Sequence, residues 1–131
     1  MKKAIVQSSD APEALGPYSQ AVTAQGMVYC SGQIAIDPAS GQLIAGGVED
    51  QTHQIMKNLK AVLKEAGSSL DEAIKCTVYL KDMANFAPFN AVYGEYFSAS
   101  SAPARATVEV SALPLDVDVE IDCIAQIPAG A

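Results

Sequence analysis

The stretch 103-PARATVEVSALPLDVDVEIDCIAQI-127 decides the fold class of this chain of 131 residues. On either side of the turn residues 111–114, apolar and polar residues alternate, which is the pattern of two half-buried β-strands. Upstream, apolar residues recur at helical spacing over 86–97 and alternate as a strand over 71–82. A second helical stripe covers 48–66 and ends before a glycine.

Three further strands are predicted before the first helix. Residues 21–36 read as two strands joined by a turn at Gln25-Gly26, with a short strand before them and a turn at 37–42 after them. The predicted order is β-β-β-α-β-α-β-β, in one domain spanning 1–131. Because the strands come in runs, this order favours an α+β fold with both helices on one face of a mixed sheet. The strands are not strongly polar on the other face, so we expect an oligomer, a trimer or a dimer, to cover it.

Composition excludes several classes of function. The net charge is −7 and no cluster of basic residues stands out, so no nucleic-acid partner is expected. No apolar run is long enough to span a membrane and no secretory leader is recognisable, which predicts a cytoplasmic protein. Cys30, Cys76 and Cys123 lack metal-ligand spacing and read as buried free thiols, so no metal is expected. The lone His53 lies off the apolar stripe of its helix and is assigned a structural or neutral role.

Arg105 is the only arginine, and it interrupts an apolar strand. Alternation places Arg105, Thr107 and Glu109 on one face of that strand. If the turn has four residues, the two final strands form a hairpin with Arg105 opposite Glu120, about 5 Å apart between Cβ atoms. A turn of three or five residues would separate them.

Two readings of this pair stay open. One is a cross-strand ion pair, worth about 0–1 kcal/mol at an exposed position. In the other, Arg105 grips a substrate carboxylate in bidentate fashion, and Glu120 holds or activates a water beside it. Both need an arginine that is shielded from water, with a carboxylate nearby to offset the cost of its desolvation.

Several motifs resemble the RidA (YjgF) family. The C-terminal one joins Pro103-x-Arg105 to Leu113-Pro114 and Glu120. Others follow in the family's order and spacing: GPYSQA at 16–21, CSGQI at 30–34, FNAVYGEYF at 89–97 and EIDCIA at 120–125. Together they cover essentially the whole chain.

This resemblance implies a chorismate-mutase-like α+β domain assembled as a homotrimer, with three clefts between subunits. It implies hydrolysis of reactive 2-imino acids, the tautomers of enamines, to 2-keto acids and ammonia. The substrates would be 2-iminobutanoate and 2-iminopropanoate, formed when threonine or serine is dehydrated. Neither a metal nor an organic cofactor is implied.

The same resemblance assigns roles to residues. Arg105 would bind the substrate carboxylate, and Glu120 would position the attacking water. Further binding residues would be Tyr18, which closes the pocket, Ser31 and Gly32, which line it, Asn90 at the carboxylate end, and Thr107. Many family members carry a cysteine where this chain has Thr107, so a thiol nucleophile is unavailable there, and attack by water requires none.

Plainer roles remain for the secondary residues. Gly32 could be a turn or close-packing residue, Tyr18 an interface residue, and Asn90 an ordinary polar helix residue. Other functions also remain: non-catalytic binding of small carboxylates, or a translation-inhibiting, RNA-cleaving or chaperone-like role. A protein that only binds a carboxylate would keep Arg105 but would not need Glu120.

Overall fold

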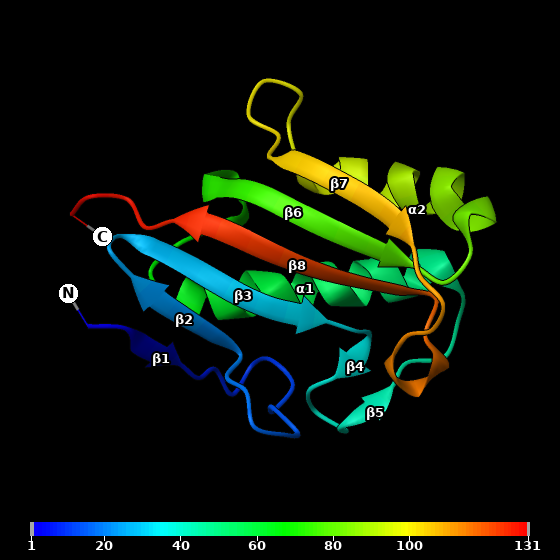
Figure 1. Cartoon of the computed structure of the whole chain (residues 1–131), viewed down its shortest axis with the longest axis horizontal. Helices are drawn as coiled ribbons and strands as arrows, with labels where there is room; N and C mark the ends of the chain where they lie inside the picture. The colour runs from blue at the N-terminus through cyan, green and yellow to red at the C-terminus, as the bar shows by residue number, and fades with distance from the viewer. Residues whose placement is uncertain (1, 131) are drawn as a thin grey trace.

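A six-stranded mixed sheet carries two helices on one face (Figure 1). The computed structural model describes residues 2–130. Across the sheet the strand order is β1-β2-β3-β8-β6-β7, and all neighbours are antiparallel except β6 and β7. The strands are β1 (Ala4–Val6), β2 (Ala21–Ala24), β3 (Met27–Gln33), β6 (Ala73–Leu80), β7 (Ala104–Glu109) and β8 (Val119–Gln126), and the helices are α1 (Val48–Glu65) and α2 (Phe86–Tyr93).

The predicted order of these eight elements is confirmed. The turn between β2 and β3 is a two-residue hairpin in which Gln25 (φ 51°) and Gly26 (φ 78°) are both left-handed. A small hairpin that was not predicted occupies the turn region, with strands β4 (Ile36–Asp37) and β5 (Gln42–Leu43). Four 3-10 turns complete the structure: η1 (Leu70–Glu72), η2 (Met83–Asn85), η3 (Gly94–Tyr96) and η4 (Pro114–Asp116).

Helix α1 supplies much of the core. Its predicted apolar stripe is buried, with Ile55, Leu59 and Val62 fully inaccessible. Asn58, also buried, donates to the carbonyl oxygens of Ile34 and Ile36 and so ties β4 to the helix. The helix ends where predicted, because Gly67 (φ 85°) adopts the left-handed conformation that follows many helices.

The second helix is shorter than predicted. It ends at Tyr93 and continues as η3, so the predicted range 86–97 covers two elements. Asn85 makes no capping hydrogen bond with its side chain. Instead Asp82 accepts a hydrogen bond from the Ala84 amide at 2.9 Å and caps η2, the turn that leads into α2.

The predicted hairpin of the last two strands is wrong. Strand β6 lies between β7 and β8, pairing parallel with one and antiparallel with the other. The physical reason is the helix between β6 and β7. A strand-helix-strand crossover returns the chain to the same end of the sheet, so β7 must run parallel to β6. Segment 110–118 then crosses the end of β6, where the Lys81 amide donates to the Asp118 carbonyl at 3.0 Å.

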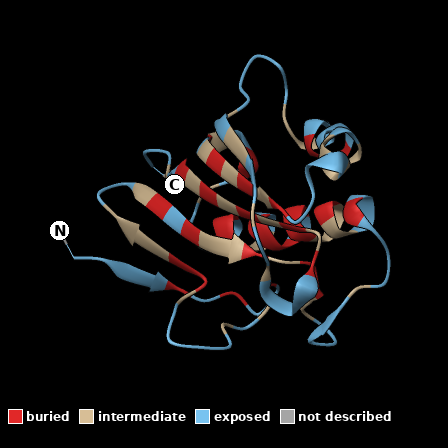
Figure 2. Cartoon of the chain, turned by 45° about the vertical axis from the view of Figure 1, so that its right-hand side comes forward, coloured by how far each residue is buried: buried red, intermediate tan, exposed pale blue. Residues whose placement is uncertain are grey.

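The face of β7 that meets the helices is the polar one. Arg105 and Thr107 lie in register with Cys76 and Val78, whose side chains are fully buried on the helix side. Ala106 therefore points to the uncovered face, and in the central strands β6 and β8 buried positions alternate with mostly half-buried ones (Figure 2).

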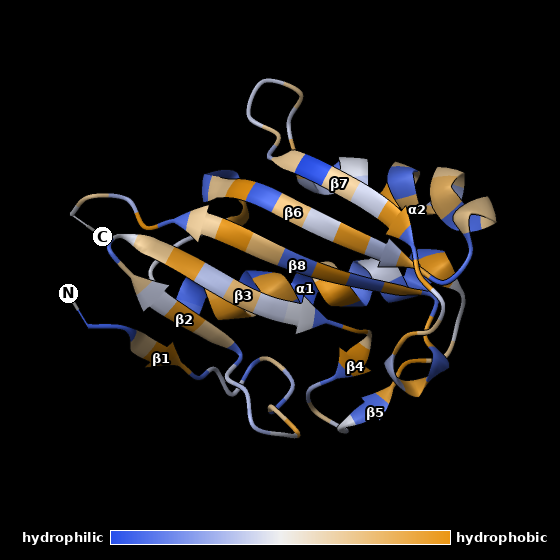
Figure 3. Cartoon of the chain, viewed as in Figure 1, coloured by the Kyte–Doolittle hydropathy of each residue, from blue (hydrophilic) through white to orange (hydrophobic). Residues whose placement is uncertain are grey.

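The uncovered face of the sheet displays large apolar side chains. Ile5 on β1, Tyr29 on β3 and Val108 on β7 are 59%, 47% and 42% exposed. Each is in register with a neighbour that also points away from the helices. Hydrophobic and hydrophilic positions alternate along β7, whereas β1 is hydrophobic at all three positions (Figure 3). This face fits the predicted oligomer, which stays a prediction.

Three cysteines lie in one row on the helix side of the sheet. Cys123 of β8 is in register with Cys30 of β3 and with Cys76 of β6. All three are buried and unpaired, as predicted. Burial raises the pKa of Cys30 to about 12, so its thiol stays protonated. Within residues 2–130, neither helix combines the length and apolar character needed to span a membrane.

Candidate functional site

Arg105 rests on an aromatic shelf provided by α2. Its guanidinium carbon lies 4.9 Å from the ring centre of Tyr93, 5.6 Å from that of Phe86 and 5.9 Å from that of Phe89. A guanidinium over ring faces is stabilised by the ring quadrupoles. Nη1 also donates to Asn90 Oδ1 at 2.7 Å. Asn90 therefore orients the arginine, and its role at the carboxylate end of a substrate stays a prediction.

The guanidinium has no acidic partner in residues 2–130. No carboxylate of this range lies within 4 Å of it, and the side chain is exposed. The predicted ion pair with Glu120 and the predicted dry setting are therefore both absent within one subunit. Four of the five guanidinium N–H groups keep their capacity to bind an anion.

Two buried hydroxyls lie behind the arginine. Thr107, on the same face of β7, has a side-chain oxygen that is inaccessible and makes no hydrogen bond with any described residue. The hydroxyl of Tyr93 is in the same state, and burial is the main cause that raises its pKa far above the usual value. Arg105, Asn90 and Thr107 thus gather at the edge strand, as three of the predicted site residues.

Glu120 lies on the uncovered face, packed against a glycine. A Cβ added at Gly32 would come within 2.9 Å of the Glu120 carboxyl carbon and closer still to Oε2. Only glycine leaves room for this carboxylate, so Gly32 acts through close packing. Burial, and after it the charge of Asp122, raises the pKa of Glu120. A carboxylate with a raised pKa is a stronger base near neutral pH.

Tyr18 lines a pocket together with Gly32, the residue that lies against Glu120, and Ser31 precedes Gly32 in β3. The Ser31 hydroxyl donates to the Ser19 carbonyl at 2.6 Å, so its hydrogen is engaged within the chain. Tyr18 is 54% exposed, and its hydroxyl accepts a long hydrogen bond, 3.4 Å, from the Leu15 amide. Tyr18 is thus free to contact another molecule.

The predicted residues therefore form two groups. Arg105 is in register with Cys76, and Glu120 with Tyr79, three residues further along β6. The two backbones are thus two strand spacings apart and offset by three residues, about 14 Å in all. Their side chains also leave opposite faces of the sheet. One subunit cannot hold both on a small substrate.

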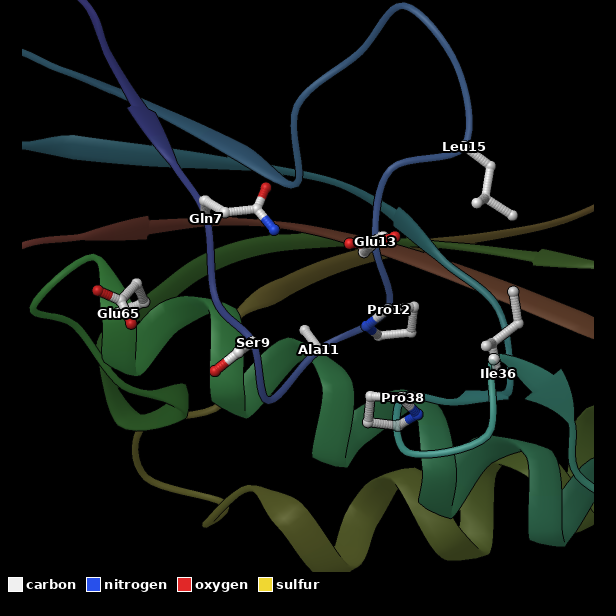
Figure 4. Close-up of a pocket in the computed structure, with 10 residues that line it drawn as sticks. Gln7, Ser9, Ala11, Pro12, Glu13, Leu15, Ile36, Pro38 and Glu65 are labelled. Atoms are coloured by element: carbon white, nitrogen blue, oxygen red, sulfur yellow. The ribbon is translucent and has the colours of Figure 1, made fainter.

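Two pockets near the N-terminal segment are separate from the arginine. One, of about 300 Å³, adjoins the glutamate group and includes Tyr18 and Gly32. Another, of about 500 Å³, contains none of the predicted site residues (Figure 4). It is lined by Gln7, Ser9, Ala11, Pro12, Glu13, Leu15, Ile36, Pro38, Gly41 and Glu65.

The structure supports the structural role predicted for His53. Its Nδ1 lies 2.7 Å from the hydroxyl of Tyr96, within hydrogen-bonding distance. Across residues 2–130, no three side chains of the ligand types His, Cys, Asp and Glu are grouped for a metal ion. The aromatic shelf, in contrast, was missed as part of the site. Phe86, Phe89 and Tyr93 share one helix face, and nothing in their helical spacing indicated that a cation would lie on it.

Comparison with known proteins gives consistent matches along the chain. The model of the family described as endoribonuclease L-PSP matches residues 8–127. A RutC family protein of Pyrococcus horikoshii is 51% identical over 123 residues, which are 94% of this chain and 97% of that protein. The mouse protein named 2-iminobutanoate/2-iminopropanoate deaminase is 46% identical and matches 92% of this chain and 89% of its own length.

One solved structure is similar to this chain in both fold and sequence. The crystal structure of RidA from the Antarctic bacterium Psychrobacter superposes with a TM-score of 0.90 at 41% identity. The match covers 95% of this chain and 99% of that one. The chain therefore belongs to the endoribonuclease L-PSP family, the YjgF/RidA family that the sequence motifs indicated.

Proposed function

We propose that this protein hydrolyses 2-imino acids to 2-keto acids and ammonia, at a site that Arg105 of one subunit and Glu120 of the next complete together. The observation that carries the proposal is the free guanidinium. Arg105 is fixed by Asn90 and the α2 aromatics, but it meets no carboxylate among residues 2–130 of its own chain. A planar cation held in this way suits a substrate carboxylate.

The chemistry follows from the two groups. With its carboxylate on Arg105, a 2-imino acid would present its C2 carbon to a water held by Glu120. As the water oxygen bonds to C2, Glu120 would accept a proton from the water, and the π electrons of the C=N bond would move to the nitrogen, which takes that proton from Glu120. The hydroxyl of this carbinolamine would then form the keto C=O bond and give its proton to the nitrogen, which leaves as ammonia as the C–N bond breaks. Orientation and general-base assistance of this kind contribute about 10²–10⁴-fold or more to rate.

Assembly of subunits is part of this proposal. The apolar residues of the uncovered face, Ile5, Tyr29 and Val108, suit burial against another copy of the chain. We propose that the assembly is the homotrimer that the family resemblance implies, with clefts between subunits. Since Arg105 and Glu120 leave opposite faces of one subunit, such a cleft would bring the two groups together from different copies.

The first test is catalytic. A threonine dehydratase would generate 2-iminobutanoate, semicarbazide would compete for it, and loss of the semicarbazone signal would report hydrolysis. Wild type is expected to suppress the semicarbazone signal. The Arg105→Ala and Glu120→Gln variants, shown to be folded and oligomeric, are expected to leave it unchanged. A wild type equal to the no-enzyme control would refute the proposal and leave carboxylate binding as the simpler function.

The second test asks whether the site is shared. Arg105→Ala and Glu120→Gln subunits would be mixed under conditions that exchange subunits. In randomly mixed oligomers about a quarter of the shared sites regain both residues, so activity should return to about that fraction. No recovery in verified mixed oligomers would place both residues in one subunit's site and contradict the proposal.

A further inference from the structure

Three separate segments surround one hollow with exposed apolar side chains. Leu15, Tyr18 and Leu115 are 75%, 54% and 64% exposed, although such side chains are stabilised by burial. They border the pocket of about 300 Å³ noted above, a volume at the lower end for a small-molecule site. Glu13 and Gly32 also line it.

The backbone at Leu115 is strained. Its φ is 55°, in the left-handed region that costs an L-residue free energy and that leucine seldom adopts. The next residue, Asp116, has φ 57° and is tied to Lys81 by an ion pair of 2.8 Å. Strain that the surroundings hold in place is characteristic of functional sites. Here it keeps a leucine side chain at the edge of the hollow.

The hollow is continuous with the glutamate group of the proposed site. Gly32 lines it, and the same residue lies against the Glu120 carboxylate. A substrate whose C2 carbon faces a water at Glu120 could therefore extend its side chain toward Leu115. Glu13 is the one charged residue of the lining, and its negative charge disfavours an acidic side chain.

We propose that this hollow binds the side chain of the substrate and that Leu115 is a specificity-determining residue. The preferred substrates are then 2-imino acids with apolar side chains of several carbons, such as the one derived from leucine. Smaller and acidic 2-imino acids bind less well. This inference rests on the proposed function, and it adds the class of substrate side chain, which follows from the lining of the hollow.

Kinetics on a series of substrates test the inference. An amino-acid oxidase would generate the 2-imino acids of alanine, leucine and glutamate, with semicarbazide as competitor. Wild type is expected to show kcat/KM about tenfold higher for the leucine-derived substrate than for the alanine-derived one. Leu115→Gly should reduce that ratio about 3- to 10-fold, mainly by lowering kcat/KM for the leucine-derived substrate. Leu43→Ala, an exposed leucine outside the lining, is the matched control and should change neither value.

Glycine at this position separates function from folding. Because glycine adopts a left-handed conformation without a steric penalty, Leu115→Gly should have a melting temperature equal to or above that of wild type. An unchanged leucine-to-alanine ratio in this stable variant would overturn the inference while the deaminase proposal stands.

If wild type hydrolyses none of the three substrates, the proposed function fails and the hollow is tested by binding. Calorimetry would compare 2-oxopropanoate with 4-methyl-2-oxopentanoate. Tighter binding of the larger keto acid to wild type, lost in Leu115→Gly and kept in Leu43→Ala, supports the hollow. Equal binding of the two keto acids refutes it.

Discussion

Gly32→Ala tests the arrangement of the glutamate group most directly. The added methyl carbon would lie 2.9 Å from the carboxyl carbon of Glu120, inside the usual contact distance, and closer to Oε2. Ordinary contacts begin near 3.4 Å. The carboxylate is the end of a flexible side chain, so it can move away and the sheet can stay intact. The expected change is therefore a displacement of the Glu120 carboxylate by about 1 Å, with the fold preserved.

This displacement should reduce turnover strongly. A catalytic group misplaced by about 1 Å costs about 100-fold in rate. We therefore expect kcat for 2-iminobutanoate to fall about 100-fold in Gly32→Ala, with a smaller change in KM because Arg105 is untouched. The coupled semicarbazide assay measures the rate. Circular dichroism and sedimentation would show that fold and assembly are retained.

Gly94→Ala is the matched control. It makes the same chemical change at a helical position (φ −63°, ψ −20°) where an added Cβ has no neighbour within 4 Å. Its activity should equal that of wild type. If Gly32→Ala is equally active, the carboxylate of Glu120 does not need the position it has here. The reasoning that connects Gly32 to catalysis would then be refuted.

Three further changes have defined outcomes. Because the folded-state pKa of Glu120 is raised, ionisation of Glu120 lowers the stability of the fold as pH rises. In urea titrations at pH 7, Glu120→Gln should therefore have a higher free energy of unfolding than wild type, and this gain should vanish below the usual glutamate pKa. A gain at all pH values would contradict the reasoning. Asp122→Asn should move the acid limb of kcat/KM to lower pH, and an unmoved limb would mean that Asp122 does not influence the base. Gln25→Asn should raise the free energy of unfolding by about 0.5 kcal/mol, because asparagine tolerates the left-handed conformation of this turn position. A lower free energy of unfolding in urea titrations would refute this prediction.

Local signals in the sequence predicted the elements well. The end of α1 before Gly67 and the turn at Gln25-Gly26 are each fixed by residues that the chain presents within one short stretch. Alternation also grouped Arg105 with Thr107 correctly. These features depend on backbone preferences that act over a few residues, so no knowledge of distant contacts was needed.

Long-range pairing was beyond the same signals. Alternation with a period of two residues shows which residues share a face of a strand, but not which of the two faces meets the helices. In β7 the face that meets the helices is the polar one. Arg105 is accommodated there because the aromatic rings of α2 accept a cation, a relation between elements that no window of sequence contains. The predicted pairing of Arg105 with Glu120 is wrong for a similar reason, because β6 lies between the two strands.

The strand order has a consequence for how the molecule is completed. Strand β8 follows all the other strands in sequence, yet it pairs with β3 on one side and β6 on the other. The β1-β2-β3 meander and the β6-α2-β7 unit share no strand pairing except through it. During synthesis both parts must wait, each with an unpaired edge, until residues 119–126 have emerged. The sheet then closes by insertion of a central strand, and premature termination before it would leave two adhesive edges.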